Sequence, residues 1–315
     1  MAKNFWQDKN VLVTGGSGFL GQHLVKRLQE KGCNPIVPSS KDYDLRFLSY
    51  ISAMLGARKI DILFHLAARV GGIGYNQKYP YDLFYDNILM GINLINASIV
   101  KQVGKFVQIG TTCSYPKHCP VPFHERNFWN GYPEETNAPY GLAKKMLLVQ
   151  LQAARQQYGF NGIYLVPTNL YGPGDKFEDH KSHVIPALIK KIIKAQENDE
   201  PSVEVWGTGG ASRDFLYVED AAKAIVLAAE KYNEPEPLNL GSGEFFRIAA
   251  LVNMIKQAVG YKGETVWDVT KPDGQPKRLL NSGAAYDALG WKAEIGLREG
   301  LEKTIEWYKE NYAKS

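Results

Sequence analysis

Cysteine is scarce in this chain, and its scarcity argues against a fold built on disulfides. Only Cys33, Cys113 and Cys119 occur among the 315 residues. An odd, sparse set of thiols does not form the paired framework of small secreted domains, and it is typical of proteins kept in a reducing compartment. We therefore expect a cytoplasmic protein that is held together by a hydrophobic core.

Long apolar runs and excess charge are missing as well. No run of about 18 apolar residues occurs, and the N-terminal residues lack the apolar segment of a signal peptide. The net charge is only +4, with no basic stripe. We therefore expect neither a membrane span nor nucleic-acid binding. The histidines and cysteines show no spacing typical of a zinc site, so no metal is predicted.

The sequence does contain short apolar runs that alternate with amphipathic stretches. Helical periodicity is clear from Phe19 to about Glu30, over 83–103 and over 139–158. The apolar runs that resemble buried strands are 10–14, 34–38, 61–68, 105–112 and 162–170. Strands that alternate with helices of this length predict an α/β protein of the Rossmann type, with a doubly wound parallel sheet covered on both faces.

The rhythm changes after Gly174, where segments become charged, irregular and richer in turns. Helices are expected near 184–196, 219–232, 248–259 and from Leu297, with strands and turns over 201–220 and a strand at 264–268. We predict a dinucleotide-binding domain over residues 1–173, to which 215–240 returns. A smaller interleaved α/β lobe, built from 174–214 and 241–315, is predicted to bind the substrate.

Three glycines follow the first predicted strand and open the first predicted helix. Gly15, Gly18 and Gly21 form GxxGxxG, with Phe19 and Leu20 between the last two. The first glycine permits a tight turn, the second lets a pyrophosphate approach the backbone, and the third allows close packing of helix and strand. The free N–H groups of the helix start attract phosphate. This context favours a dinucleotide site over a merely flexible turn.

The residues after the second predicted strand bear on the choice of cofactor. An NAD site usually places a carboxylate there for the ribose hydroxyl, whereas this chain has Ser39, Ser40 and Lys41. Two hydroxyls and a cation suit a 2′-phosphate, which predicts NADP(H); the alternative is that Lys41 is a solvated loop residue. Asp44 follows, either facing the adenine or forming a turn.

Tyr140 and Lys144 form YxxxK, which places both side chains on one face of a predicted helix. A lysine beside a tyrosine is expected to lower the pKa of the phenol, and such a phenol passes a proton to a carbonyl oxygen as hydride arrives at carbon. Thr111, at the end of a predicted strand, can hydrogen-bond the same oxygen. YxxxK alone can be an exposed helix face, and the combination with Thr111 and the glycines favours the catalytic interpretation.

Several longer stretches carry a more specific resemblance. They are HLAARVGGIGYN (65–76), TTCSYPK (111–117), EETNAPYGLAKK (134–145), PTNLYGPGDKF (167–177), SHVIPALI (182–189), VWGTGGASRDFLYVED (205–220) and KPDGQPKRLL (271–280). Over essentially its whole length the chain resembles the extended short-chain dehydrogenases/reductases, and in particular the GDP-L-fucose synthase family. The resemblance implies NADPH-dependent 3,5-epimerisation and 4-reduction of GDP-4-keto-6-deoxy-D-mannose to GDP-L-fucose.

The resemblance also implies roles for single residues around the cofactor. Thr111, Tyr140 and Lys144 take the family's Ser/Thr-Tyr-Lys roles, with Tyr140 as proton donor to the C4 oxygen and Lys144 also holding the nicotinamide ribose. Many members have serine at the position of Thr111, and threonine adds a stiff methyl group. Ala67 and Asn169 are expected to line the cofactor site, with Asn169 beside the nicotinamide.

The family's two epimerisation residues correspond to Cys113 and His183. A 4-keto group acidifies the hydrogens at C3 and C5, so a base can remove one and an acid can return a proton on the opposite face. The resemblance implies Cys113 as the base and His183 as the acid. Taken alone, Cys113 could be a small buried apolar residue and His183 a hydrogen-bonded structural histidine.

Four further residues are expected by the same resemblance to contact the GDP part of the substrate: Lys191, Trp206, Arg213 and Arg278. A diphosphate calls for cations, and arginine can bind it with two bonds. The family commonly has arginine at the position of Lys191. It also has KPDGxPRK where this chain has KPDGQPKR, so the contact of Arg278 can shift to Lys277. The alternatives are solvated surface charges and, for Trp206, a core aromatic.

Two other functions stay open on the sequence alone. One is a reductase or epimerase of a different NDP-4-keto-6-deoxy sugar, such as a GDP-heptose derivative. The other is a non-catalytic, nucleotide-sensing protein on the same fold, against which the complete set of Thr111, Tyr140 and Lys144 argues. The resemblance further implies a homodimer, in which the helices over 83–103 and 139–158 of each subunit form a four-helix bundle.

Overall fold

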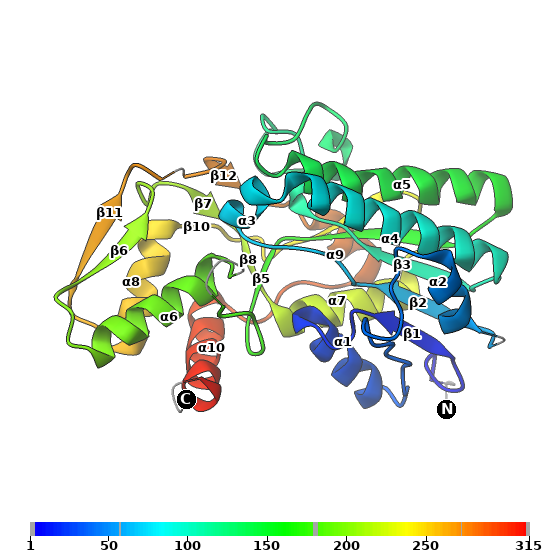
Figure 1. Cartoon of the computed structure of the whole chain (residues 1–315), viewed down its shortest axis with the longest axis horizontal. Helices are drawn as coiled ribbons and strands as arrows, with labels where there is room; N and C mark the ends of the chain where they lie inside the picture. Colours follow the sequence, from blue (N-terminus) through cyan, green and yellow to red (C-terminus); the bar gives the residue numbers. More distant parts are fainter. Residues whose placement is uncertain (1–3, 57, 179–181, 272, 313–315) are drawn as a thin grey trace.

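The structure is a computed structural model of the chain, and it describes residues 4–56, 58–178, 182–271 and 273–312. Its centre is a parallel sheet in the order β1-β2-β3-β4-β9 (Figure 1). The strands are β1 (Val11–Thr14), β2 (Ile62–His65), β3 (Lys105–Ile109), β4 (Gly162–Pro167) and β9 (Pro237–Leu240). This confirms the predicted doubly wound α/β fold.

The predicted strand over 34–38 is wrong in its extent. Only Ile36 joins the sheet, through a parallel bridge to Leu12 in which it accepts from Val13 N and donates to Val11 O. Pro35 and Pro38 flank it, and proline has no N–H to give to a ladder.

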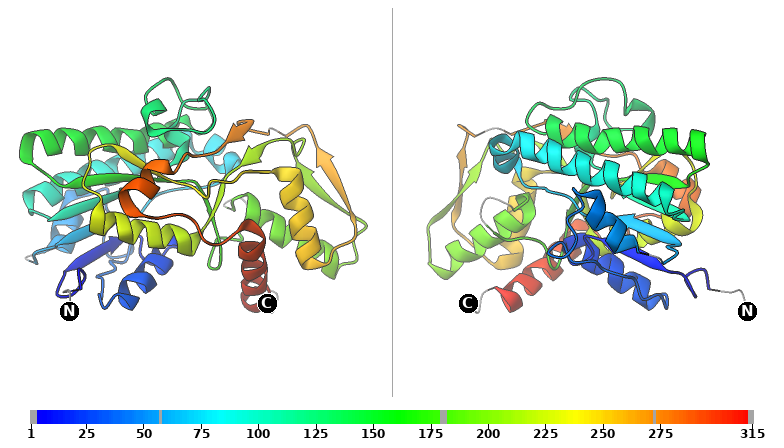
Figure 2. Two further views of the ribbon diagram at one scale, coloured as in Figure 1. Left: turned by 180° about the vertical axis from the view of Figure 1, so that it is seen from behind. Right: turned by 45° about the vertical axis from the view of Figure 1, so that its right-hand side comes forward.

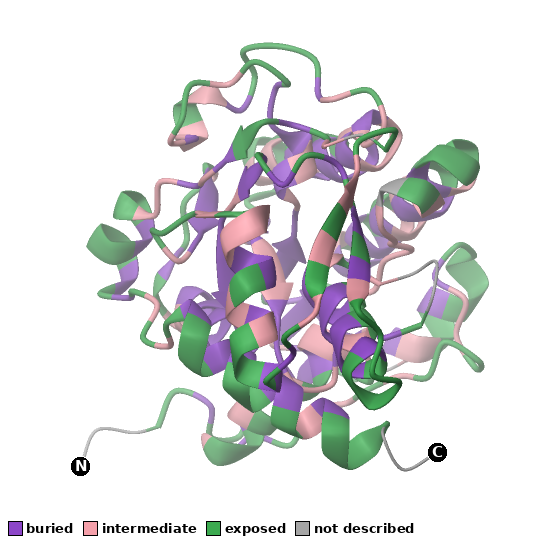
Figure 3. Ribbon diagram, turned by 90° about the vertical axis from the view of Figure 1, so that its left-hand side faces the viewer, coloured by how far each residue is buried: buried purple, intermediate pink, exposed green. Residues whose placement is uncertain are grey.

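Helices cover both faces of the sheet. On one face lie α1 (Phe19–Glu30) and α7 (Val218–Lys231), and on the other α4 (Pro80–Val100) and α5 (Ala138–Tyr158), as Figure 1 shows. The short α2 (Leu48–Leu55) packs against α4. Buried residues gather between these layers, while exposed ones occupy the outer helix faces (Figure 3).

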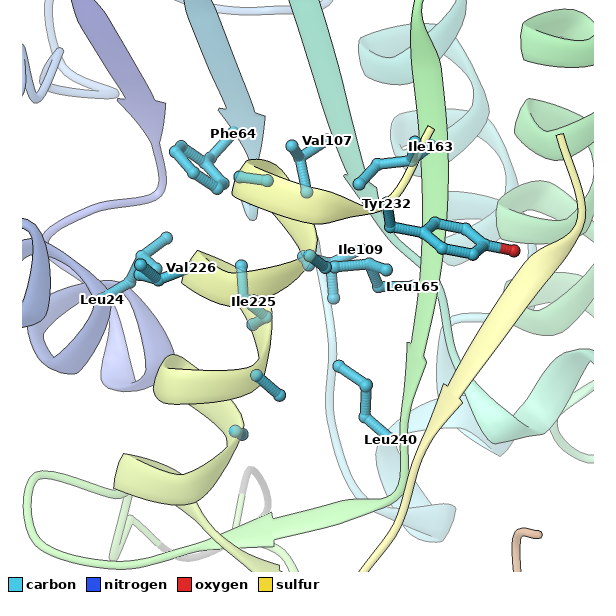
Figure 4. Packing of buried hydrophobic residues seen from close by; sticks show 14 of the residues in the cluster. Leu24, Phe64, Val107, Ile109, Ile163, Leu165, Ile225, Val226, Tyr232 and Leu240 are labelled. Carbon is cyan, nitrogen blue, oxygen red and sulfur yellow. The ribbon is translucent and has the colours of Figure 1, made fainter. Parts of the chain in front are cut away.

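The core under α7 shows how the layers are joined. Phe64, Val107 and Leu165 come from three neighbouring strands, and they pack against Ile225 and Val226 of α7 (Figure 4). Each of these side chains is at most 1% exposed. A second core lies on the opposite face of the sheet, under α4 and α5. The two faces together fix the carboxyl ends of the strands, where ligands of this fold bind.

Helix α4 is apolar for its length. Within the described residues it is the one helix that could cross a membrane by length and composition, with a mean hydropathy of 1.3. It nevertheless packs along α5 and buries Leu94 and Ile95 completely in the second core. Packing inside the protein therefore accounts for part of its apolar character, with 44% of the apolar window buried.

The second lobe is built from small sheets and helices (Figure 2). Its strands pair as β5 (Asn169–Tyr171) with β8 (Phe215–Tyr217), β6 (Ser202–Trp206) with β11 (Glu264–Asp268), and β7 (Ser212–Arg213) with both β10 (Phe246–Arg247) and β12 (Lys277–Arg278). The helices are α6 (Val184–Glu197), α8 (Ile248–Val259) and α10 (Leu297–Asn311). They share a third hydrophobic core.

Two details differ from the sequence prediction. The single strand predicted over 162–170 breaks at Thr168, so that β4 and β5 belong to different sheets. Helix α9 (Gly283–Leu289) packs against α7 and β9 and contributes Ala285 and Leu289 to the first core. Packing thus places this helix with residues 1–173, although the proposed division puts it in the lobe.

Candidate active site

The glycine turn brings β1, α1 and the end of β2 into close contact. Gly15 has φ +72°, and a Cβ there would stand 2.7 Å from the backbone nitrogen of Ala67. A Cβ on Gly21 would stand 2.1 Å from the carbonyl oxygen of Gly15. Both glycines are therefore required for the start of α1 to approach the sheet this closely. Ala67 lies beside the turn, and its contact with a cofactor stays a prediction.

The start of α1 has room and polarity for a phosphate. Its N-cap is Gly18, no side chain caps it, and its first turn holds no acidic residue. Phe19 and Leu20 follow and are only partly buried. Uncapped N–H groups at a helix start attract anions. The turn and the helix start therefore fit the diphosphate of a dinucleotide.

The loop after Ile36 presents polar groups beside this turn. Val37 lies next to Gly16, while Ser39, Ser40 and Lys41 are exposed, with Lys41 N donating to Ser39 Oγ over 3.1 Å. Hydroxyls and a free cation in this position fit a 2′-phosphate.

Asp44 has a partner that the sequence did not reveal. Arg46 donates to its carboxylate from the guanidinium, at 2.7 Å for the Nη2 bond, and these bonds hold the pKa of Asp44 below its usual range. Arg46 also pairs with Asp86 of α4 at 3.2 Å. The structure thus ties Asp44 to α4 through an arginine; a contact with adenine stays a prediction.

A glycine that was not singled out sets the position of Tyr140. Gly141 lies in the first turns of α5, and a Cβ there would stand 2.2 Å from the carbonyl oxygen of Cys113. Ser114 Oγ also donates to the carbonyl oxygen of Gly141 over 2.8 Å. The helix therefore lies directly against the 3-10 turn η1 (Thr112–Ser114) that follows β3. This contact brings Tyr140 to Thr111.

Thr111 lies near enough to Tyr140 to affect the pKa of its phenol. The electrostatics differ from the sequence prediction. Burial raises the pKa of Tyr140, Cys113 and Tyr164 raise it further, and Thr111 acts in the opposite direction. Lys144 is not among the groups that shift the pKa of this phenol. Desolvation dominates because the ring stands in a densely packed region.

Lys144 lies one helical turn beyond Tyr140 and is 2% exposed. Burial lowers its pKa from 10.5 to about 7. Within the described part of the chain, its ammonium has no hydrogen-bond acceptor. A buried cation without an acceptor costs free energy, so this group fits the hydroxyls of a bound ribose. His65, at the end of β2, is also buried, and burial together with Lys144 lowers its pKa.

Cys113 lies in the same turn as Thr111, with its backbone N–H donating to Thr111 Oγ1 over 3.2 Å. Its thiol faces Arg278 of β12, whose Nη1 is 3.7 Å from the sulfur. Arg213 of β7 is the register partner of Arg278. The structure therefore brings Arg213 and Arg278 together beside Cys113. The placement of Arg278 against a thiol was not visible in the sequence, because 165 residues separate the two.

His183 is the N-cap residue of α6 and is exposed. The protein atoms around its ring nevertheless desolvate it and lower its pKa, with Lys176 adding to the effect. The carbonyl oxygen of the preceding Ser182 lies close to Gly72, at the start of α3 (Ile73–Lys78). Among the described contacts none joins His183 to Cys113, so its role as the acid stays a prediction.

The other predicted residues have neighbours of their own. Lys191 donates to the carbonyl oxygen of Glu204 in β6 over 2.6 Å. Trp206, at the end of β6, is 57% exposed, and Lys271 lies 5.4 Å from its ring centroid. Asn169 donates to the carbonyl oxygen of Asp214 over 2.8 Å. A core position for Trp206 is thereby excluded.

A polar network that the sequence reasoning missed orders the entrance to α5. Asn137, the N-cap residue, donates to Glu134 over 2.5 Å and accepts from Asn76 of α3 over 2.9 Å. The stretch EETNAPY supplies Asn137 and the stretch GGIGYN supplies Asn76, and only the fold brings these two asparagines together. The second 3-10 turn, η2 (Glu125–Asn127), lies in the loop between η1 and α5.

Among the described residues, no group of three or more His, Cys, Asp or Glu side chains could hold a metal ion.

Comparisons with known proteins agree with this arrangement. Residues 11–241 match the model of the NAD dependent epimerase/dehydratase family. The GDP-L-fucose synthase of Sinorhizobium fredii is 38% identical, over 97% of both chains. A GDP-L-fucose synthetase of Naegleria fowleri, solved bound to NADP, has a TM-score of 0.89 at 28% identity and covers 99% of this chain and 98% of its own. A GDP-6-OMe-4-keto-L-xylo-heptose reductase of Campylobacter jejuni has a TM-score of 0.91 at 26% identity, covering 98% and 99%. The chain therefore belongs to the NAD dependent epimerase/dehydratase family of extended short-chain dehydrogenases/reductases, in the branch of the GDP-L-fucose synthases.

Proposed function

We propose that this protein is an NADPH-dependent enzyme that epimerises GDP-4-keto-6-deoxy-D-mannose at C3 and C5 and reduces it at C4, giving GDP-L-fucose. The observation that carries the proposal is the junction of β3 with α5. There a hydroxyl, a phenol and a buried ammonium stand beside a thiol that faces two arginines. The first three groups suit carbonyl reduction, and the thiol adds a base for C–H chemistry. The identity to named GDP-L-fucose synthases supports the same conclusion.

The residues of the first domain hold the cofactor. The glycine turn and the start of α1 receive the diphosphate, Ser39, Ser40 and Lys41 receive the 2′-phosphate, and Lys144 binds the ribose hydroxyls. Asn169 stands beside the nicotinamide. When bound, NADPH supplies a hydride to C4 of the sugar.

Epimerisation precedes reduction because it depends on the keto group. Cys113 removes the proton at C3 or C5, and the electron pair moves onto the C4 oxygen, which Thr111 and Tyr140 stabilise by hydrogen bonding. His183 returns a proton on the opposite face. In the final step Tyr140 donates its proton to the C4 oxygen. Its raised pKa keeps that proton in place until it is needed.

The lobe binds the nucleotide part of the substrate. Arg213 is a half-buried cation opposite Arg278, and the exposed face of Trp206 can stack on a flat ring. Lys191 and Lys277 add charge for the diphosphate.

A second sugar is the main alternative. The likeness to the heptose reductase is as high in structure as the likeness to the fucose synthetase. The first experiment therefore incubates the purified protein with NADPH and GDP-4-keto-6-deoxy-D-mannose, follows the reduced-nicotinamide absorbance, and identifies the product by NMR. We expect NADPH oxidation with GDP-L-fucose as product. Oxidation that gives only a non-epimerised sugar would remove Cys113 and His183 from their roles. No oxidation with this sugar, and turnover with a GDP-4-keto-heptose, would support the alternative.

We also propose that the protein is a homodimer in the cytoplasm. Tyr81, Tyr85 and Ile92 of α4 and Met146 and Val149 of α5 are exposed apolar side chains on two neighbouring helices. Such a patch suits burial against a second copy. Light scattering at assay concentration is expected to give twice the mass of 35.3 kDa; a monomeric mass would contradict the dimer. The described cysteines are unpaired, as a reducing compartment favours.

A further inference from the structure

The thiol of Cys113 has an unusual neighbour for a base. The guanidinium of Arg278 stands 3.7 Å from its sulfur and is 8% exposed. Gln275 holds the guanidinium in this position, because its Oε1 accepts from Nε of Arg278 over 3.2 Å. The amide of Gln275 is itself fixed, since its Nε2 donates to the carbonyl oxygen of Lys117 over 2.8 Å. The arginine is therefore oriented by a chain of bonds that ends in the loop after Cys113.

A second arginine strengthens the positive charge at this point. β12 runs parallel to β7 with Arg278 opposite Arg213. Arg213 is held by the carbonyl oxygens of Ser212, Gln275 and Asp273, so no carboxylate neutralises it in these bonds. Two guanidinium groups thus lie side by side on neighbouring strands.

The electrostatic effect on Arg213 identifies what the pair faces. Burial lowers the pKa of Arg213 to about 10, and Arg278 adds to the lowering because like charges repel. Cys113 acts in the opposite direction, together with Asp273 and Glu134. Arg213 therefore lies within electrostatic reach of the sulfur of Cys113.

We propose that Arg278 is a positioning residue that keeps Cys113 in its thiolate form and holds the sulfur for proton abstraction, an inference that rests on the proposed epimerase function. An ordinary cysteine is only a few per cent thiolate at neutral pH, and a neighbouring arginine increases that fraction. The thiolate takes the proton from the sugar carbon and becomes a thiol, the C–H electron pair forms a double bond to C4, and the carbonyl π pair moves to the C4 oxygen. The arginine stays protonated throughout.

The order of Lys277 and Arg278 in β12 determines which of the two cations is buried beside the sulfur. Successive residues of a strand point to opposite faces, and here the second position is the buried one while Lys277 is exposed. A planar guanidinium occupies the buried position, and it can donate to Gln275 and to the sulfur at once. A lysine in that position retains the charge without the fork.

The test measures the thiol directly in the ligand-free protein. Iodoacetamide reacts with thiolates, and peptide mass spectrometry follows Cys113 alone. Cys33 is buried, and burial raises the pKa of Cys119 to about 11, so both are expected to react slowly. The variants are Arg278→Gln, which removes the charge, and Arg278→Lys, which keeps it. Arg247→Gln is the matched control, because Arg247 is an exposed arginine on β10 of the same three-stranded sheet.

Arg278→Gln is expected to slow alkylation of Cys113 at pH 7 about tenfold, which corresponds to a shift of one pH unit in thiolate formation. Arg278→Lys is expected to recover at least half of the lost rate, and Arg247→Gln to leave it unchanged. Equal rates in the wild type and Arg278→Gln would overturn the proposal. If Arg278→Gln is not folded by circular dichroism, the Lys variant decides, because a rate below one tenth of the wild type would then contradict a role for the charge.

Deuterium uptake at C3 and C5 of GDP-4-keto-6-deoxy-D-mannose, without NADPH, separates this inference from the proposed function. Arg278→Gln is expected to slow uptake about tenfold as well, because the thiolate is the base. If the wild type exchanges no deuterium while its alkylation still depends on Arg278, the epimerase function fails and the pairing of Arg278 with Cys113 stands. If exchange is fast in both proteins, the pairing has no role in catalysis.

Discussion

The two sides of the site are organised differently. On the proposed reductase side, formed by Thr111, Tyr140 and Lys144, the groups stand after β3 and on α5, and a glycine contact fixes the distance between these elements. On the proposed substrate side, Lys191 of α6 and Trp206 of β6 are exposed, whereas Arg213 of β7 is half-buried opposite the buried Arg278 of β12. The groups proposed for proton transfer thus stand at the packed junction of two elements, while those proposed to recognise the nucleotide are spread over a lobe of small sheets.

Removing one group from the reductase side alone tests most directly whether the two sides act separately. Tyr140→Phe is expected to lower kcat for NADPH oxidation by about a thousandfold, because a general acid is lost while the ring is retained. Deuterium uptake at C3 and C5 should fall far less, since Cys113 is untouched and Thr111 still stabilises the C4 oxygen. NMR of the sugar together with the absorbance assay measures both. Loss of uptake by the same factor would mean that both steps depend equally on the phenol.

Cys113→Ser acts on the other chemical step. Deuterium uptake and GDP-L-fucose formation are expected to fall at least about a hundredfold, because a serine hydroxyl is a much weaker acid than a thiol. NADPH binding, followed by fluorescence titration, should be unchanged. Product formation at the wild-type rate would exclude Cys113 as the base.

The contact between the two elements can be tested without touching any reacting group. Gly141→Ala places a Cβ 2.2 Å from the carbonyl oxygen of Cys113, so α5 must move away from η1. Overpacking of this kind is expected to lower the free energy of unfolding by about 3 kcal/mol in urea denaturation. A fall in kcat/KM accompanies it, because Tyr140 leaves Thr111. The control Gly296→Ala has no atom within 4 Å of the new Cβ and should change stability by less than about 0.5 kcal/mol.

The burial of Lys144 predicts how the stability of the protein depends on pH. Its pKa is about 7 in the folded protein, below the ordinary 10.5. The unfolded chain therefore binds more protons than the folded one between these values, so stability rises with pH across this window. Relative to Lys144→Met, the ligand-free wild type is expected to gain about 3 kcal/mol between pH 7 and pH 9.5. Parallel stability curves for the two proteins would show that the ammonium is not desolvated.

The smallest effect is expected at the proposed contact with the 2′-phosphate of the cofactor. Lys41 is exposed, and Lys41→Gln should raise KM for NADPH about fivefold to tenfold, as the loss of one charged hydrogen bond implies. KM for NADH should not change, because NADH lacks the 2′-phosphate. An equal rise for both cofactors would place Lys41 elsewhere than at that phosphate.

Much of the fold was predictable because its signals are local. The glycine turn, α1, α8 and β11 follow directly from strings such as TGGSGFLG and ETVWD. The failures lie where tertiary context decides. Two prolines reduced 34–38 to one bridge, and the run 162–170 divided between two sheets at Thr168. The spacing of apolar residues along the sequence does not reveal where a strand is shortened or divided between sheets.

The site shows the same limit more clearly. Tyr140 and Lys144 were predictable because a helix fixes residues four apart on one face. The raised pKa of the phenol was not, because burial depends on the packed surroundings of Tyr140. Gly141 gave no signal of its own, since its importance lies in the carbonyl of Cys113, 28 positions earlier.

The long separation between Cys113 and Arg278 also concerns the making of the protein. The ribosome adds Cys113 to the chain 165 residues before it adds Arg278. Until β12 emerges, the nascent chain exposes an ordinary, poorly nucleophilic cysteine to the oxidants and electrophiles of the cell. The reactive sulfur therefore comes into being only when the strand that activates it is in place beside it.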